Sequence, residues 1–134
     1  MKYILDTNVL SAVRRADRGA KVRAWLAAQK DENLFLSVIT IGEIARGIRQ
    51  QERRDPTFCV ELQTWLNRTQ LLFSDRILPF SASDALVWGR LSADLGHNGA
   101  DLMIAATALN HDATVVTGNV SDFAPTLVRV ENPF

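Results

Sequence analysis

Short hydrophobic runs alternate with longer amphipathic stretches along the chain. The runs have the length of buried strands and are YIL (3–5), LFLSV (34–38), ILPF (77–80), TVVT (114–117) and LVRV (127–130). Helical patterns separate most of them, and these cover residues 21–29, a stretch starting near Thr40, a stretch after Asp55-Pro56, residues 81–96 and residues 100–111. Strands that alternate with helices predict an α/β fold with a mostly parallel central sheet.

Residues that favour helix ends mark several of these boundaries. Asp55 followed by Pro56 predicts an N-cap and first helical position, and Gly96 predicts a helix C-terminus. Thr40 predicts another N-cap, and Glu43 follows at the capping-box spacing T-x-x-E. Glu43 therefore has a structural interpretation of its own.

Composition and charge limit the class of protein. A length of 134 residues with 47% hydrophobic and 22% charged residues predicts one folded domain over residues 1–134. No apolar run approaches the roughly 20 residues of a membrane helix, and no secretory signal is evident, so we expect a cytoplasmic protein without a membrane partner. The formal net charge is +0, so any basic surface must come from local clusters such as residues 14–18 and 46–54.

Four acidic residues fall where predicted strands give way to helices. Asp6 ends the first hydrophobic run, Glu43 follows the second, Asp101 opens a late helix, and Asp122 lies in the loop after the fourth run. The carboxyl ends of parallel strands meet at one edge of a sheet, so we expect these acids to lie close together. Crowded carboxylates repel one another unless a cation neutralises them. Mg²⁺ prefers such oxygen ligands, and no histidine or cysteine accompanies them as in a zinc site.

Small polar residues stand beside two of these acids. Thr7, Asn8, Thr117 and Asn119 are placed to orient carboxylates and bound waters. Turn formation and helix capping explain each of them equally well when it is taken alone.

A basic stripe follows Glu43 at three- and four-residue spacing. Its members are Arg46, Arg49 and Arg53, and on a helix they lie on one face. Such a stripe can bind the phosphate backbone of RNA. A solvated helix face whose arginines pair with Glu52 and Asp55 is the alternative that the spacing leaves open.

Four segments of the chain resemble one known family. LDTNVLSA (5–12), LSVITIGEIARGI (36–48), ADLMIAATA (100–108) and TGNVSDF (117–123) resemble, in this order and spacing, the PIN-domain ribonucleases. The likeness extends to the VapC toxins of bacterial VapBC toxin–antitoxin pairs, including the FitB-like group, and covers nearly the whole chain. It implies a PIN-domain-like α/β/α sandwich.

The resemblance implies roles for the same four acids. Asp6 and Asp101 become the principal metal ligands, Glu43 a ligand or water-positioning acid, and Asp122 a supporting ligand. One position departs from the pattern, because many relatives have Arg where this chain has Gly118. A basic side chain beside the fourth acid is therefore not expected here.

The implied function is that of a Mg²⁺- or Mn²⁺-dependent endoribonuclease whose metal-activated water cleaves RNA and leaves a 5′-phosphate. The implied partners are a VapB-type antitoxin that blocks the acidic pocket and ties the complex to operator DNA, and a second copy of the chain in a homodimer. A phosphoacceptor receiver domain is disfavoured, because it needs a late lysine and none follows Lys30. Two alternatives stay open: a catalytically inactive PIN-fold nucleic-acid-binding module, and a nuclease that acts on DNA.

Overall fold

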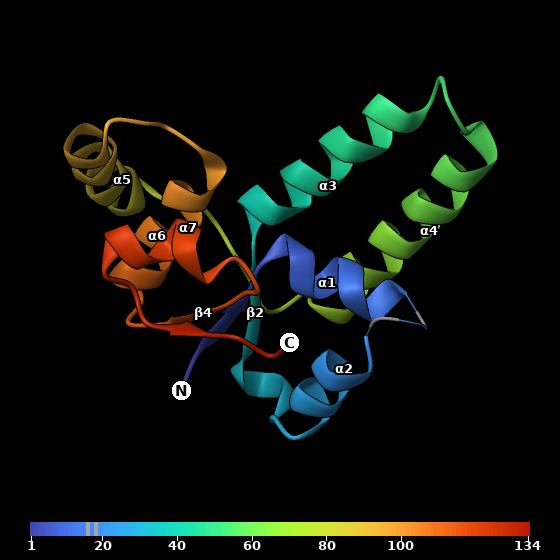
Figure 1. Ribbon diagram of the computed structural model, residues 1–134, viewed down its shortest axis with the longest axis horizontal. Helices are drawn as coiled ribbons and strands as arrows, with labels where there is room; N and C mark the ends of the chain where they lie inside the picture. The colour runs from blue at the N-terminus through green and yellow to red at the C-terminus, as the bar shows by residue number, and fades with distance from the viewer. Residues whose placement is uncertain (16, 18) are drawn as a thin grey trace.

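Five parallel strands form the central sheet of the computed structural model, in the order β3-β2-β1-β4-β5 (Figure 1). The structure describes residues 1–15, 17 and 19–134, so Arg18 of the first basic cluster lies outside the described residues. The strands are β1 (Tyr3–Leu5), β2 (Leu34–Ser37), β3 (Ile77–Leu78), β4 (Thr114–Val116) and β5 (Val130–Glu131). Each pairing between neighbouring strands is parallel, which confirms the predicted sheet.

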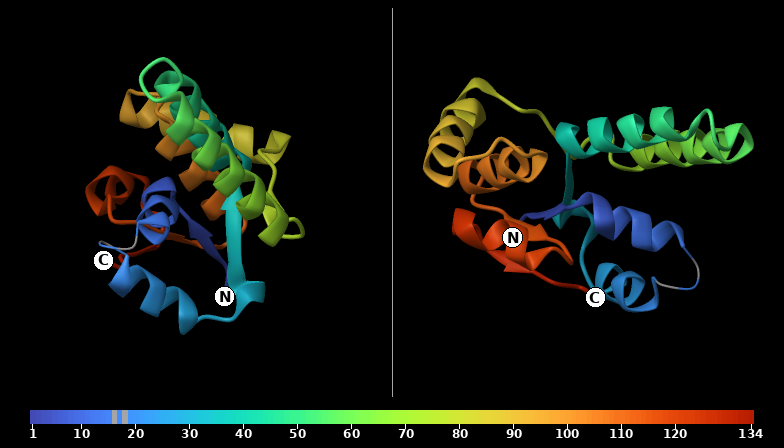
Figure 2. Two further views of the ribbon diagram at one scale, coloured as in Figure 1. Left: turned by 90° about the vertical axis from the view of Figure 1, so that its right-hand side faces the viewer. Right: turned by 45° about the horizontal axis from the view of Figure 1, so that its top comes forward.

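Helices connect the strands and cover the sheet. They are α1 (Thr7–Arg14), α2 (Ala20–Ala27), α3 (Val38–Gln51), α4 (Pro56–Leu72), α5 (Ala82–Leu95), α6 (Ala100–Asn110) and α7 (Val120–Phe123), with 3₁₀ turns at Asp31–Asn33 and Ala124–Thr126. Helices α3 and α4 run side by side and extend away from the sheet, whereas α5 and α6 pack together at the opposite end (Figures 1 and 2). Among the described residues, no helix is both long and apolar enough to cross a bilayer.

Successive strand residues divide the hydrophobic core between the two faces of the sheet. Leu5 and Val116 belong to one buried cluster, which also holds residues of α1, α2, α3 and α4. Their neighbours Ile4 and Val115 belong to the other, which holds residues of α6 and α7. Each such buried side chain contributes about 1.5–3 kcal/mol relative to exposure. Helices therefore cover both faces, and the predicted α/β/α sandwich is confirmed.

Two predicted helix ends are confirmed and one is wrong. The Asp55 carboxylate accepts a hydrogen bond from the Phe58 N–H at 3.1 Å, and Gly96 ends α5 with a left-handed φ of 76°. Helix α3, however, begins at Val38 rather than near Thr40, and Ser37 is its N-cap.

The position of Thr40 removes the capping-box interpretation of Glu43. The Ser37 hydroxyl accepts a hydrogen bond from the Ile39 N–H at 3.1 Å. Thr40 instead lies in the first turn of α3 with its side chain fully buried, and Glu43 follows in the second turn. A residue this far into a helix does not cap it, so Glu43 is free for another role.

The last strand lies further along the chain than its hydrophobic pattern predicts. It covers Val130–Glu131 instead of residues 127–130. Leu127 adopts a left-handed φ of 62° at the end of the second 3₁₀ turn. This turn reverses the chain before the strand begins, and so the first part of the hydrophobic run cannot be extended.

Candidate active site

Asp6 lies at the carboxyl end of β1, beside the end of β4. Its N–H donates to the Val116 carbonyl oxygen at 2.9 Å. Its Oδ1 accepts a hydrogen bond from the Thr7 N–H at 2.8 Å, and its Oδ2 accepts one from the Thr117 hydroxyl at 2.8 Å. The residue is only 7% exposed. Two neutral donors and the sheet register therefore fix a nearly buried carboxylate.

The Thr117 hydroxyl connects this carboxylate to the next polar residues. Besides donating to Asp6, it accepts hydrogen bonds from the Asn8 side-chain amide at 3.2 Å and from the Asn119 N–H at 2.9 Å. One donated and two accepted bonds use the full capacity of a hydroxyl. Asn8 Oδ1 in turn accepts a hydrogen bond from the Gly118 N–H at 3.3 Å. The small polar residues beside the acids thus form a connected network.

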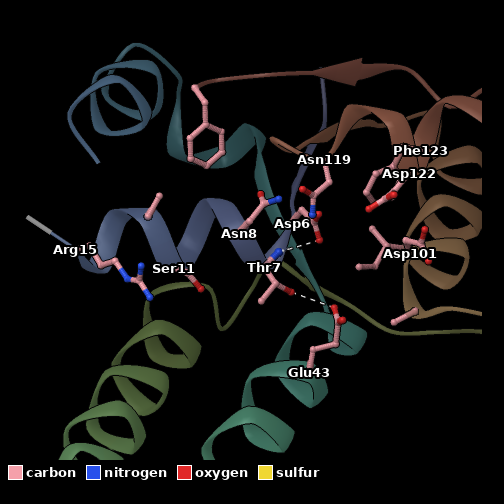
Figure 3. A pocket seen from close by; sticks show the side chains of 14 residues that line it. Asp6, Thr7, Asn8, Ser11, Arg15, Glu43, Asp101, Asn119, Asp122 and Phe123 are labelled. Carbon is pink, nitrogen blue, oxygen red and sulfur yellow. Dashed lines mark hydrogen bonds between the residues drawn. The ribbon is translucent and has the colours of Figure 1, made fainter. Parts of the chain in front are cut away.

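Glu43 approaches the same place from α3. The Thr7 hydroxyl donates to Glu43 Oε1 at 3.0 Å, which joins the first turn of α1 to the second turn of α3 (Figure 3). Thr7 thereby contacts two of the predicted acids, one through its N–H and one through its hydroxyl.

Asp101 and Asp122 face this region from α6 and α7. Asp101 is the second residue of α6 and Asp122 the third residue of α7. A Cβ atom added at Gly99 would lie 2.6 Å from Asp101 Oδ1, so the glycine leaves the space that the carboxylate occupies. Figure 3 shows Asp6, Glu43, Asp101 and Asp122 around one opening, and all four line a cavity of about 750 Å³.

The carboxylates influence one another electrostatically. Burial raises the pKa of Asp6, against the hydrogen bonds from Thr117 and Thr7, and the charges of Asp101 and Asp122 raise it further. Partial desolvation in the cavity raises the pKa of Glu43, and the charges of Asp6 and Asp101 add to this rise, whereas the Thr7 hydrogen bond and the charge of Arg46 oppose it. Within the described chain, none of the four acids forms an ion pair with a basic side chain.

The donor set fits a hydrated magnesium ion. The cavity lining offers carboxylate, amide and hydroxyl oxygens and includes neither histidine nor cysteine among its described residues. Over residues 1–15, 17 and 19–134, no three acidic, histidine or cysteine side chains converge into a ready-made cage. Mg²⁺ retains several waters and binds through one or two carboxylates plus substrate phosphate, so an open acidic cavity suits it better than a closed one.

One basic residue of the cavity was not predicted as a site residue. Arg15, directly after α1, is the single cation among the described residues that line the cavity. Asn8, Ser11, Ala12 and Arg15 all line it, at the i, i+3, i+4, i+7 spacing of one helix face. The spacing was present in the sequence, and combined with the placement of Asn8 it would have indicated Arg15.

The basic stripe is only partly a feature of one helix. Arg46 and Arg49 lie on α3, whereas Arg53 lies in the turn beyond its end. Arg49 pairs with Glu52 at 2.5 Å, as the solvated-face alternative predicts. None of the three lines the acidic cavity, so an RNA-binding role for them stays a prediction.

Comparison with known proteins identifies the family of this fold and site. The PIN domain family matches residues 3–124. The chain belongs to the PIN-domain family. It is 33% identical to the toxin FitB of Neisseria gonorrhoeae, over 98% of this chain and 97% of FitB. It is 32% identical to the VapC ribonuclease Y4jK of Sinorhizobium fredii, over 98% of this chain and 96% of that protein.

The structural comparison agrees with the sequence comparison. The structure of FitAB bound to an IR36 DNA fragment contains a chain with a TM-score of 0.83 and 33% identity, over 98% of this PIN domain and 94% of that chain. The resemblance to VapC and FitB-like proteins that the four motifs indicate is thereby confirmed, together with the predicted PIN-domain fold.

Proposed function

We propose that this PIN domain is the toxin of a type II toxin–antitoxin system and acts as a Mg²⁺-dependent endoribonuclease, with Mn²⁺ as an alternative ion. The observation that carries the proposal is the convergence of four carboxylates, from four separate segments, on one open cavity, where none of them forms an ion pair with a basic side chain of the described residues. The names of two relatives, a VapC ribonuclease and a toxin, support the same activity.

The bound ion would supply a water of lowered pKa and a positive charge facing the phosphate. Asp6, Asp101, Glu43 and Asp122 would hold that ion, with Asp6 and Asp101 as its principal ligands. The Thr7 hydroxyl donates to Glu43 Oε1, so Glu43 Oε2 would either bind the ion or accept a hydrogen bond from the attacking water, which are the two roles proposed for this residue. Thr117 holds Asp6, and Asn8 and Asn119 hold Thr117. This arrangement holds Asp6 and Glu43 in place before substrate arrives, so these two acids need no reorganisation during the reaction.

The proposed substrate is RNA, cleaved to leave a 5′-phosphate. Asp6 and Arg15 lie at the two ends of α1, nine positions apart, which at 1.5 Å per residue is about 14 Å, so Arg15 can bind a phosphate beyond the one that is cleaved. Arg46, Arg49 and Arg53 extend the basic surface along α3 and past its end. Their proposed role is to bind the RNA backbone outside the cavity.

The proposed partners follow from the FitB-like relatives. FitAB is a complex bound to DNA, and we propose that a VapB-type antitoxin inserts a segment into the acidic cavity here and brings the complex to operator DNA. A homodimer and a cytoplasmic location belong to the same proposal.

An RNA cleavage assay with matched proteins tests the function. Wild type and Asp101→Asn, purified identically, are incubated with single-stranded RNA in Mg²⁺, in Mn²⁺ and in chelator, and the new ends are tested for 5′-phosphate. We expect cleavage only by wild type with added metal. Equal cleavage by both proteins, or full cleavage in chelator, contradicts the proposal.

A DNA oligonucleotide of the same sequence, assayed in parallel, separates the two alternatives. Cleavage of the DNA but not of the RNA favours a DNA-directed nuclease. Binding of RNA without cleavage under any metal condition favours an inactive nucleic-acid-binding module.

A further inference from the structure

A half-exposed aromatic ring lines the same cavity as the four acids. Phe134 is 44% exposed and contributes to the cavity wall. A Cβ atom added at Gly118 would lie 2.9 Å from Phe134 Cδ2 and 3.0 Å from its Cε2. The ring therefore packs directly against the Gly118 backbone, in space that any larger residue at position 118 would take.

Local contacts hold the backbone at Phe134. Its N–H donates to Asn132 Oδ1 at 3.0 Å, and the intervening Pro133 is buried. Strand β5 ends three residues earlier at Glu131, which pairs in register with Val116 of β4. The ring is thus attached to the same strand pair that carries the polar network of the site.

The contact with Gly118 also joins the ring to the acids. The Gly118 N–H donates to Asn8 Oδ1, and the Asn8 amide donates to the Thr117 hydroxyl that holds Asp6. A short run of contacts therefore leads from the buried carboxylate to the aromatic ring. Gly118 does not have a positive φ, so its lack of a side chain serves the close approach of the ring rather than a special backbone conformation.

The two parts of the cavity suit the two parts of a nucleotide. Carboxylates that bind a cation suit the phosphodiester, whereas an exposed aromatic ring suits a base. Proteins bind single-stranded RNA mainly by stacking unpaired bases on aromatic side chains. A cavity of about 750 Å³ lies in the range of pockets that enclose drug-sized ligands, so it has room for more than a phosphate.

We propose that the Phe134 ring, packed on Gly118, is a stacking platform for the nucleobase next to the cleaved phosphodiester, and that it favours a purine there. This inference rests on the proposed ribonuclease function and adds a base-binding subsite to it. Stacking on an aromatic ring favours the larger purines, so the preferred base at this position is a purine.

The test compares ring replacements at Phe134 with the same change at a phenylalanine that does not line the cavity. Phe134→Leu and Phe134→Ala remove the ring and Phe134→Trp keeps one, while Phe58→Leu is the control, because Phe58 is half-buried on α4 and does not line the cavity. Binding is measured in an Asp101→Asn background, so that the RNA is not consumed. The probe is a short single-stranded RNA with 2-aminopurine at successive positions around the bond that wild type cleaves.

We expect Phe134→Ala to weaken RNA binding roughly 5- to 150-fold, the range that corresponds to the loss of one base–aromatic stack. Phe134→Leu should abolish 2-aminopurine quenching at one position and remove the purine preference at the cleaved site. Phe134→Trp and Phe58→Leu should retain both. Thermal melts of every variant report whether the fold is intact.

Gly118→Ala gives a second, independent variant. The added methyl group meets the ring, so it should reduce quenching at the same position, and this effect should vanish when Phe134 is already alanine. If wild type cleaves RNA while Phe134→Leu binds, quenches and cuts like Phe58→Leu, the stacking platform is wrong and the ribonuclease function stands. If wild type neither binds nor cleaves RNA, both proposals fail.

Discussion

Replacing Thr117 and Thr40, one at a time, with valine should change the free energy of unfolding in opposite directions. Thr117 and Thr40 both have completely buried side chains. The Thr117 hydroxyl makes three hydrogen bonds, one of them to the Asp6 carboxylate. The Thr40 hydroxyl has no hydrogen-bond partner among the described residues. Valine keeps the shape of threonine and replaces the hydroxyl with a methyl group, so each substitution tests the hydrogen bonding of one site.

The expected magnitudes follow from the partners that are lost. At Thr117, losing a hydrogen bond to a charged group costs about 1.5–3 kcal/mol, and leaving two other donors unpaired adds to it. Because Asn8 and Asn119 are partly accessible to water, their unpaired N–H groups can bind water and add only a part of the full cost. We therefore expect Thr117→Val to lower the free energy of unfolding by about 2–4 kcal/mol in total. At Thr40, burying an unpaired hydroxyl costs free energy in the folded state, because the hydroxyl loses its hydrogen bonds to water. Thr40→Val removes this cost and should raise the free energy of unfolding by about 1 kcal/mol.

Urea unfolding of wild type and both variants measures these changes. For a chain of 134 residues, 1 kcal/mol corresponds to a melting-temperature shift of about 4 °C, so thermal melts give a second reading. The Thr117 hydrogen bond lowers the pKa of Asp6. Thr117→Val should therefore also move the acidic limb of the cleavage–pH profile to higher pH, whereas Thr40→Val should leave the profile unchanged. A Thr117→Val variant as stable as wild type would refute the hydrogen-bond assignment at position 117, and a Thr40→Val variant less stable than wild type would refute it at position 40.

Three further predictions concern the acids and the basic stripe. Asp101→Asn should be at least as stable as wild type in chelator, because it relieves repulsion, should gain less from Mg²⁺ in thermal melts, and should not cleave RNA. Asp84→Ala should cost about 2–4 kcal/mol in urea unfolding at pH 7, because it removes a fully buried, hydrogen-bonded carboxylate. Despite burial, hydrogen bonds from Ser81 and Asn110 hold the pKa of Asp84 below its ordinary value of 3.8. The contribution of Asp84 to the free energy of unfolding is therefore fully present above pH 3.8. The difference in stability between wild type and Asp84→Ala should shrink as the pH falls through the lowered pKa. Replacing Arg46, Arg49 and Arg53 together with Gln should flatten the salt dependence of RNA binding; an unchanged slope in a salt titration favours the solvated face.

Local patterns were sufficient to predict the parts of the site that depend on topology. The hydrophobic runs locate the strands, and parallel pairing alone then brings Asp6 and the end of β4 to the same edge. The position of Glu43 beside Thr7 follows similarly from the turn after β2. This prediction needs no interatomic distances, because the carboxyl ends of parallel strands lie at the same edge of a sheet whatever their side chains are.

Choices that depend on tertiary contacts were not predictable in the same way. Ser37 and Thr40 are both good N-caps. The structure uses Ser37, where the pairing of β2 with β3 ends, and buries Thr40. The left-handed φ of Leu127 cannot be predicted from a hydrophobic pattern, because it does not change which residues are apolar. The packing of Phe134 on Gly118 joins two positions whose contact only the arrangement of β4 and β5 reveals.

The choice of neutral donors around the acids has a consistent physical reason. An arginine in place of Thr117 would stabilise the Asp6 carboxylate more strongly, because charge-assisted hydrogen bonds exceed neutral ones. It would also cancel the negative charge that attracts a cation. Thr7 and Thr117 hold the carboxylates of Asp6 and Glu43 and leave that charge intact, while burial and the neighbouring acids keep the pKa of Asp6 raised. The four carboxylates therefore repel one another while hydrogen bonds hold Asp6 and Glu43 in place, and in the proposed function a bound divalent cation would relieve that repulsion without requiring this network to rearrange.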